Sequence, residues 1–232
     1  MFGGEKRIDM IQAVLFDLDG TVLDTERIYR EGLIEGAREL GLPADVIKEH
    51  PYLTGTIFDD GKRHMQDIYG EDFPFDAWFR AMRGYADRLF ESQPIPTKPG
   101  VPEVFYKLRE MECKTALVTG TRAHRVEKYL TRLGLEDCFD CLVCGEDVTH
   151  GKPAPDPYLL AARRLGVDPA DCMVVEDARY GILSAKNAGM CPVFALDLYP
   201  LPPEIEVYAQ YSVLSLSEIP GLVEKKNQEK KI

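Results

Sequence analysis

The segment Ala13-Val-Leu-Phe-Asp-Leu-Asp-Gly-Thr21 joins a wholly apolar run to two closely spaced carboxylates, Asp17 and Asp19. Residues 13–16 are apolar without alternation, which predicts a strand that is covered on both faces in a parallel sheet. Gly20 permits an abrupt turn, so both carboxylates are expected at the carboxyl end of this strand, where open α/β sheets bind ligands. Two carboxylates placed there need a cation or a shared proton, although a solvated Asp-Gly turn would give the same pattern in isolation.

Similar apolar runs recur along the chain and are separated by helical patterns. They cover residues 114–119, 141–147, 172–177, 191–197 and, more weakly, 211–214. Between them, Pro102 stands where a first helical residue should, Asp156 is expected to cap another helix, and apolar residues such as Val104 recur at helical spacing. Gly134 and Gly166 stand where helices should end. This alternation predicts an α/β fold with a parallel sheet and helices on both of its faces.

A long insertion separates the first predicted strand from the second. Roughly 95 residues lie between them, far more than one crossover helix requires. Apolar residues at helical spacing, Ile57, Met65 and Trp78 among them, predict a small all-helical domain over residues 26–92. The remaining parts are a core of residues 10–25 and 93–220 and terminal tails at 1–9 and 221–232, of which we expect the charged end from residue 224 to be frayed.

The two connections to this insertion are the expected hinges. Residues 93–100 contain three prolines, which disfavour a helix there, and residues 22–25 directly follow the carboxylate turn. The helical domain is therefore tethered beside the suspected site, in a position to act as a lid.

Composition limits the classes of partner. The chain carries 39 acidic and 28 basic side chains, a formal charge of -11, which argues against general attraction to nucleic acid or anionic lipid. Its apolar runs are too short to span a bilayer, and the first nine residues carry no hydrophobic signal core. We therefore expect a cytoplasmic protein that binds neither nucleic acid nor membrane, as a monomer or a homodimer.

The six cysteines are too sparse for a disulfide scaffold, so reduced thiols are expected. Cys138, Cys141 and Cys144 form a C-x2-C-x2-C run, which leaves open a zinc or iron–sulfur site. The favoured interpretation is a buried strand with cysteines in the core, because residues 141–144 are apolar throughout.

Polar residues follow four of the predicted strands, namely Asp17 and Asp19, Thr119-Gly-Thr121, Gly151-Lys-Pro-Ala-Pro-Asp156, and Glu176-Asp177. Parallel strands end at one edge of their sheet, so we expect these side chains to meet. Singly, Thr119 could be a strand-terminal hydroxyl, Lys152 a surface cation, and the acids at 176 and 177 the start of a helix. Their joint occurrence at four strand ends favours a catalytic site.

These four segments, DLDGT, VTGT, GKPAPD and VVEDA, resemble the motifs of the haloacid dehalogenase-like hydrolase superfamily, in the arrangement of its phosphoglucomutase-like and sugar-phosphatase branch. The resemblance extends from about Ile11 to Leu214 and includes the helical insertion. It implies a Rossmann-like core with a mobile helical cap, a magnesium cofactor, and a small phosphate monoester as substrate.

The resemblance also implies a role for each residue. Asp17 would attack phosphorus to form an aspartyl-phosphate intermediate, and Asp19 would protonate the leaving alkoxide and then deprotonate the water. Thr119 and the amide of Gly120 would bind phosphate oxygens, while Lys152 would offset negative charge. Mg²⁺ prefers oxygen ligands, and those implied here are Asp17, a backbone carbonyl at or near Asp19, Glu176 (directly or through water) and Asp177.

Related activities differ in residues that can be checked. Dehalogenases lack the second aspartate, so Asp19 argues against dehalogenation. Phosphonate hydrolysis uses a cap lysine, and neither Lys48 nor Lys62 matches its pattern. The hexose-phosphate mutases carry a histidine where Tyr29 stands and a Lys-Gly-x-x-Arg run where this chain has Leu53-Thr-Gly-Thr-Ile-Phe58. We therefore favour a phosphatase, with a β-phosphoglucomutase-like mutase as the alternative.

Two questions stay open at this point. A catalytically silent binding subunit would lack a catalytic group, and every expected group is present. Substrate selection would fall to the cap, and its polar candidates are Tyr29, Thr56, Lys62, Arg63 and His64, although each is more simply explained as a structural residue.

Overall fold

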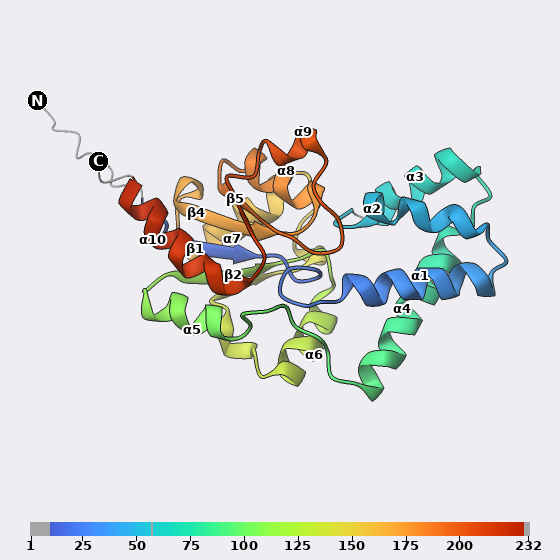
Figure 1. Ribbon diagram of the computed structural model, residues 1–232, viewed down its shortest axis with the longest axis horizontal. Coiled ribbons are helices and arrows are strands. Elements are labelled where there is room, and N and C mark those ends of the chain that lie inside the picture. Colours follow the sequence, from blue (N-terminus) through green and yellow to red (C-terminus); the bar gives the residue numbers. More distant parts are fainter. Residues whose placement is uncertain (1–9, 57, 230–232) are drawn as a thin grey trace, which may run out of the picture.

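The computed structural model describes residues 10–56 and 58–229. Within them, six parallel strands form one sheet in the order β3-β2-β1-β4-β5-β6 (Figure 1). The strands are β1 (Ala13–Phe16), β2 (Lys114–Val118), β3 (Cys141–Val143), β4 (Cys172–Glu176), β5 (Cys191–Ala195) and β6 (Tyr211–Val213). Every predicted strand is confirmed. β1 ends at Phe16 as predicted, and each of the other strands ends before the last residue of its predicted run, where the chain turns into a loop.

Helices cover both faces of the sheet, as the sequence predicts. One face packs against α5 (Glu103–Glu110), α6 (Ala123–Leu133) and α10 (Ile219–Glu229), and the other against α7 (Asp156–Leu165) and α8 (Arg179–Asn187). In β1, Val14 and Phe16 join the first of these cores, while Ala13 and Leu15 join the second. The uninterrupted apolar run is thus explained by burial on both sides.

The helical cap lies to one side of the sheet (Figure 1). It contains α1 (Glu26–Glu39), α2 (His50–Leu53), α3 (Phe58–Tyr69) and α4 (Phe75–Ser92), and a further short helix, α9 (Pro203–Glu206), belongs to the core. Trp78 is fully buried between α1 and α4, and its indole N–H donates to the Leu33 carbonyl at 2.8 Å. Ile57, which we assigned to this helical interior, lies outside the described residues.

Cap and core touch on both sides of the strand ends. The Tyr199 hydroxyl of the core lies 3.0 Å from Nδ1 of His50 in α2. On the other side, Arg125 of α6 forms an ion pair with Asp87 of α4. The cap is therefore held against the core in this structure.

Three local expectations need correction. The segment from residue 224, expected to be frayed, is helical to Glu229, because Ile219 and Val223 pack into the core and Asn227 accepts a hydrogen bond from the Ile11 amide. The helix expected to be capped by Asp156 begins at that residue and has Pro155 at its N-cap. The helix after Pro102 begins one residue later than predicted, at Glu103.

The cysteines are free thiols, as expected. Among the described residues, the one group of side chains that could hold a metal is carboxylate, so the C-x2-C-x2-C run forms no such group. Cys138 and Cys144 are buried, which supports their interpretation as core residues. A helix with the length and apolarity to cross a membrane is also absent from the described part of the chain.

Candidate active site

Three carboxylates meet where β1 and β4 end. These strands pair directly, and the Asp17 amide donates to the Val175 carbonyl at 3.0 Å. Asp17, Glu176 and Asp177 each offer one oxygen, and these oxygens lie within 4.8 Å of one another. Asp17 and Glu176 are 8% and 1% exposed, so their charges are largely removed from water.

The ionised forms of these three carboxylates would be stabilised by a cation. Burial raises the pKa of Asp17 to about 8, even though the Lys152 ammonium lowers it. Burial and the charges of Glu176 and Asp17 hold the pKa of Asp177 well above its usual range. Several carboxylate oxygens at one point are the ligands that Mg²⁺ prefers, so the residues present fit this ion.

Lys152 supplies positive charge from the loop that follows β3. Its Nζ donates to Asp17 Oδ1 and to Glu176 Oε1, both at 2.5 Å, and to the Val118 carbonyl at 3.0 Å. Burial alone would lower the pKa of Lys152, but the two carboxylates raise it above its ordinary value. The side chain is therefore a fixed ammonium between the first and fourth strand ends.

Asp19 faces a different set of partners. Its Oδ1 accepts hydrogen bonds from the Thr25 hydroxyl at 2.8 Å and the Tyr29 hydroxyl at 3.0 Å, and its Oδ2 accepts from Thr121 at 2.8 Å. Arg83 of α4 in turn donates to the Tyr29 hydroxyl at 3.2 Å. The hinge, the cap and the core thus each donate one hydrogen bond to this carboxylate.

The end of β2 brings Thr119 and Gly120 to the same edge. Thr119 is buried, and its hydroxyl accepts a hydrogen bond from the Thr121 amide at 3.0 Å. Gly120 is exposed, and the Val118 carbonyl just before these residues accepts the hydrogen bond from Lys152. All the residues named from the sequence motifs therefore lie at one edge of the sheet.

The sequence analysis assigned no role to several residues of this site. The Tyr158 hydroxyl of α7 donates to Glu176 Oε1 at 2.7 Å, and the Thr21 hydroxyl donates to Asp177 Oδ1 at 3.1 Å. A Cβ on Gly181 would lie 1.8 Å from Cδ of Glu176, so that glycine is required for close approach. Arg83 carried no signal either, whereas Thr21 and Thr121 stand inside the DLDGT and VTGT motifs, which assigned them no role.

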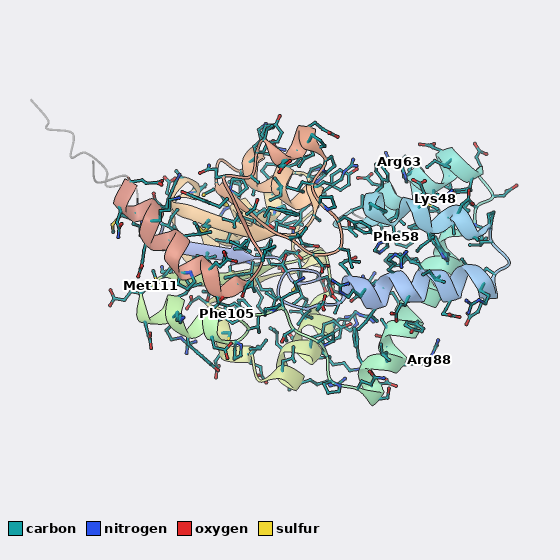
Figure 2. The ribbon with its side chains drawn as sticks, in the orientation of Figure 1. Lys48, Phe58, Arg63, Arg88, Phe105 and Met111 are labelled. Atoms are coloured by element: carbon teal, nitrogen blue, oxygen red, sulfur yellow. The ribbon has the colours of Figure 1, made fainter. Side chains whose placement is uncertain are left out.

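The polar cap candidates have structural partners. Lys62 pairs with Asp76 at 2.9 Å, Arg63 with Asp60 at 2.7 Å, and His64 lies 2.7 Å from Glu49. Figure 2 places Arg63 and Phe58 on the cap, away from the sheet. Two other candidates are likewise tied to the protein itself, Tyr29 to Asp19 and Thr56 to the backbone of α2.

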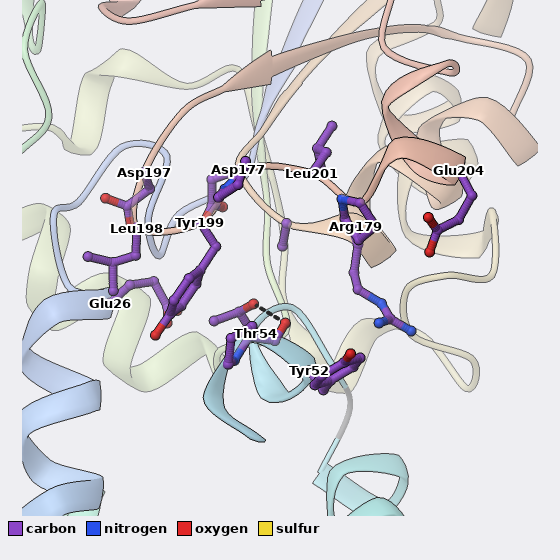
Figure 3. A pocket seen from close by; sticks show the side chains of 14 residues that line it. Glu26, Tyr52, Thr54, Asp177, Arg179, Asp197, Leu198, Tyr199, Leu201 and Glu204 are labelled. Atoms are coloured by element: carbon purple, nitrogen blue, oxygen red, sulfur yellow. Dashed lines mark hydrogen bonds between the residues drawn. The ribbon is translucent and has the colours of Figure 1, made fainter. Parts of the chain in front are cut away.

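A cavity of about 250 Å³ opens beside the carboxylates. It lies between α2 of the cap and the core segments that follow β4 and β5 (Figure 3). Asp177 lines it, together with Tyr52 and Thr54 from the cap and Arg179 and Tyr199 from the core. The arrangement can bind a divalent cation, present the Asp17 carboxylate to an electrophile, and hold an organic group next to both.

Comparisons with known proteins give this geometry a context. A family model described as haloacid dehalogenase-like hydrolase matches residues 11–189. The chain is 35% identical over 179 residues to fructose-1-phosphate phosphatase YqaB of Escherichia coli, covering 76% of this chain and 92% of that protein. It is 31% identical over 188 residues to the phosphorylated carbohydrates phosphatase of Thermotoga maritima, covering 80% and 85%.

Solved structures include a similar fold with a phosphorylated ligand. CbbY from Rhodobacter sphaeroides, in complex with xylulose-(1,5)bisphosphate, matches with a TM-score of 0.74 and 26% sequence identity. The match covers 90% of this chain and 96% of that chain.

Proposed function

The chain belongs to the haloacid dehalogenase-like hydrolase family and is a phosphoric monoester hydrolase, and on that premise we propose that it removes phosphate from a small phosphorylated carbohydrate with the help of Mg²⁺. The single observation that carries the proposal is the meeting of Asp17, Glu176, Asp177 and Lys152 at one sheet edge. It combines a nucleophilic carboxylate with the charge compensation that a phosphate dianion requires.

The proposed attack is made by Asp17. One of its oxygens forms a bond to phosphorus as the bond to the sugar oxygen breaks, which gives an aspartyl-phosphate. Lys152 stabilises negative charge on the Asp17 carboxylate and on the phosphoryl group, and Thr119 with the Gly120 amide orients the non-bridging oxygens of the phosphate. Mg²⁺, held by Asp17, Asp177, the region of Asp19 and, directly or through water, Glu176, would neutralise charge on the phosphoryl group when bound.

Asp19 is the proposed acid and base. Its carboxyl group would give a proton to the departing sugar oxygen and later take one from the water that cleaves the aspartyl-phosphate. The hydroxyls of Thr25, Tyr29 and Thr121 hold it in one orientation. This leaves Asp17 free of proton transfer, so the two aspartates have separate tasks.

The mutase alternative gains no support from the cap. Thr54 and Phe58 stand where the mutase pattern has lysine and arginine, so the cap lacks the cations that would hold a bisphosphate. Without them, water is expected to reach the aspartyl-phosphate and complete hydrolysis.

The test is phosphate release from p-nitrophenyl phosphate and a panel of sugar phosphates, with Mg²⁺ and with EDTA. Wild type should turn over only with the metal, Asp17→Asn should be inactive, and Asp67→Asn, an exposed cap position, should match wild type. Incubating glucose 1-phosphate with a bisphosphate primer should give phosphate and no glucose 6-phosphate. An active Asp17→Asn protein would contradict the proposed nucleophile, and an inactive wild type would contradict the function.

A further inference from the structure

The cavity beside Asp177 is placed to receive whatever is attached to the phosphate. Asp177 lines the cavity and also belongs to the cluster of three carboxylates that includes Asp17. One carboxylate oxygen of Asp177 lies within 4.8 Å of one of Asp17. A phosphate held at that group can therefore extend its organic part between α2 of the cap and residues 197–204 of the core (Figure 3).

Arg179 is the most informative residue of the cavity wall. It opens α8, and its guanidinium carbon lies 5.1 Å from the ring centre of Tyr52 in the cap and 4.5 Å from that of Tyr180 in the core. One terminal nitrogen donates to the Tyr180 hydroxyl at 2.9 Å. Its Nε is buried and has no hydrogen-bond partner within the described residues, so a donor is left that a ligand oxygen would satisfy.

The charges around the cavity select against a second anion. Its lining includes the carboxyl groups of Glu26, Asp177, Asp197 and Glu204, and Arg179 is the one basic side chain among the described residues that line it. Asp197 is paired with Lys98 at 2.8 Å, but the other three carboxyl groups still outnumber the single cation of the lining. A second phosphate or a carboxylate on the substrate would therefore face more carboxyl groups than cations. Neutral hydroxyl groups can both donate to carboxyl oxygens and accept from the guanidinium.

The other walls suit a carbohydrate chain. Thr54 and Tyr199 bring hydroxyl groups to the cavity, from the cap and the core respectively. The Tyr52 ring is stacked with His64 and lies under Arg179, so the ring that offers apolar area to the C–H groups of a sugar or polyol is that of Tyr199. The cap contributes one side and the core the other, so the cavity is complete only with the cap in place.

We propose that this cavity is the subsite for the neutral, polyhydroxylated part of a phosphate monoester, and that Arg179, stacked on Tyr52, determines the specificity for it. This inference rests on the proposed phosphatase function and adds the substrate class. It separates sugar and polyol monophosphates from bisphosphates and from phosphorylated sugar acids.

The test compares kcat/KM for the best sugar or polyol monophosphate with kcat/KM for acetyl phosphate, whose leaving group is too small to fill the cavity. In Arg179→Met this ratio should fall about tenfold or more, because a hydrogen bond from a charged group is lost. Tyr52→Leu should lower it about threefold or more through loss of the stacking face. Tyr52 is 47% exposed, so this second variant does not threaten the fold.

Arg63→Ala is the matched control, because Arg63 is a solvent-exposed cap arginine that does not line the cavity. Its ratio should equal that of wild type. Unchanged ratios in both Arg179→Met and Tyr52→Leu would overturn the subsite.

The substrate panel gives an independent readout. Wild type should prefer hexitol and hexose monophosphates to fructose 1,6-bisphosphate and to 6-phosphogluconate by about tenfold or more in kcat/KM, a difference expected from placing a second anion near the carboxyl groups that line the cavity. Preference for either of these two competitors, each of which carries a second anionic group, would overturn the proposed substrate class. A wild type inactive on acetyl phosphate as well would contradict the phosphatase function itself, which distinguishes the two failures.

Discussion

Replacing Lys152 with methionine should destabilise the metal-free protein and remove most of its activity. Lys152 is 8% exposed, and its Nζ donates to Asp17, to Glu176 and to the Val118 carbonyl. Methionine keeps the apolar stem but removes the ammonium, which leaves two carboxyl groups and a carbonyl oxygen without this donor.

The size of the effect follows from this burial. Removing one partner of a buried ion pair costs about 3–5 kcal/mol, because the remaining charge is left uncompensated. The carboxyl groups can take up a proton in response, which places the expected loss near about 3 kcal/mol. In a domain of this size each kcal/mol lowers Tm by about 2–4 °C, so the expected shift is about 6–12 °C.

The assay is thermal and urea unfolding of wild type and Lys152→Met in EDTA and in Mg²⁺. Because Mg²⁺ would neutralise the same carboxylates, the difference between the two proteins should shrink when it is present. Phosphatase activity should fall about 100- to 1,000-fold, the usual cost of losing one group that stabilises transition-state charge. Lys107→Met, at an exposed position of α5, is the control and should leave both quantities close to wild type.

The reasoning would be refuted by a Lys152→Met protein whose free energy of unfolding in EDTA lies within about 1 kcal/mol of wild type. That result would mean that the ammonium contributes no net stabilisation to the carboxylates it contacts. A normal rate of phosphate release would separately exclude Lys152 from the chemistry.

Two further predictions concern the surroundings of the site. Burial lowers the pKa of His50 to about 4, so the unfolded chain binds more protons between pH 4 and 6.5, and stability should fall as pH drops through this window. Urea unfolding should show wild type losing about 2 kcal/mol more than His50→Gln between pH 7 and pH 5, and equal losses would contradict this. Gly181→Ala should cost about 1–3 kcal/mol and reduce activity, because its Cβ would overlap Glu176, whereas Gly221→Ala, with open space around its Cβ, should not destabilise. Similar urea midpoints for the two glycine variants would argue against the predicted overlap.

The sheet could be predicted because its strands are buried on both faces. Residues 13–16 and 172–176 are apolar almost throughout for that reason, and their parallel order places the following carboxylates together. Asp17, Lys152 and Asp177 could thus be grouped before any distance was known. The same pattern failed at the C-terminal helix, because its many lysines and glutamates outweigh the few apolar residues that anchor it.

The partners of the candidate catalytic groups could not be predicted, because they depend on how distant helices pack. Tyr158 lies on an apolar helical face, where a core tyrosine and a tyrosine aimed at Glu176 give the same pattern. Arg83 is one of many charged residues on the cap helices, and only the crossing of α1 and α4 places it over the Tyr29 ring. Arg179 and Tyr52 are separated by more than half the chain, and the contact exists only when cap and core meet.

The proposed nucleophile and the proposed acid are held in place by different parts of the molecule. The Asp17, Glu176 and Lys152 cluster is made entirely by strand ends and loops of the core, so it forms regardless of where the cap lies. Asp19 is held through Tyr29 of the cap and Thr25 of the hinge as well as through Thr121. Moving the cap away would therefore remove the Tyr29 hydrogen bond from the proposed acid while leaving the contacts of the proposed nucleophile in place. The proposed acid is thus oriented in part by the same cap position that completes the cavity for the organic group, and on this proposal proton transfer is coupled to substrate enclosure.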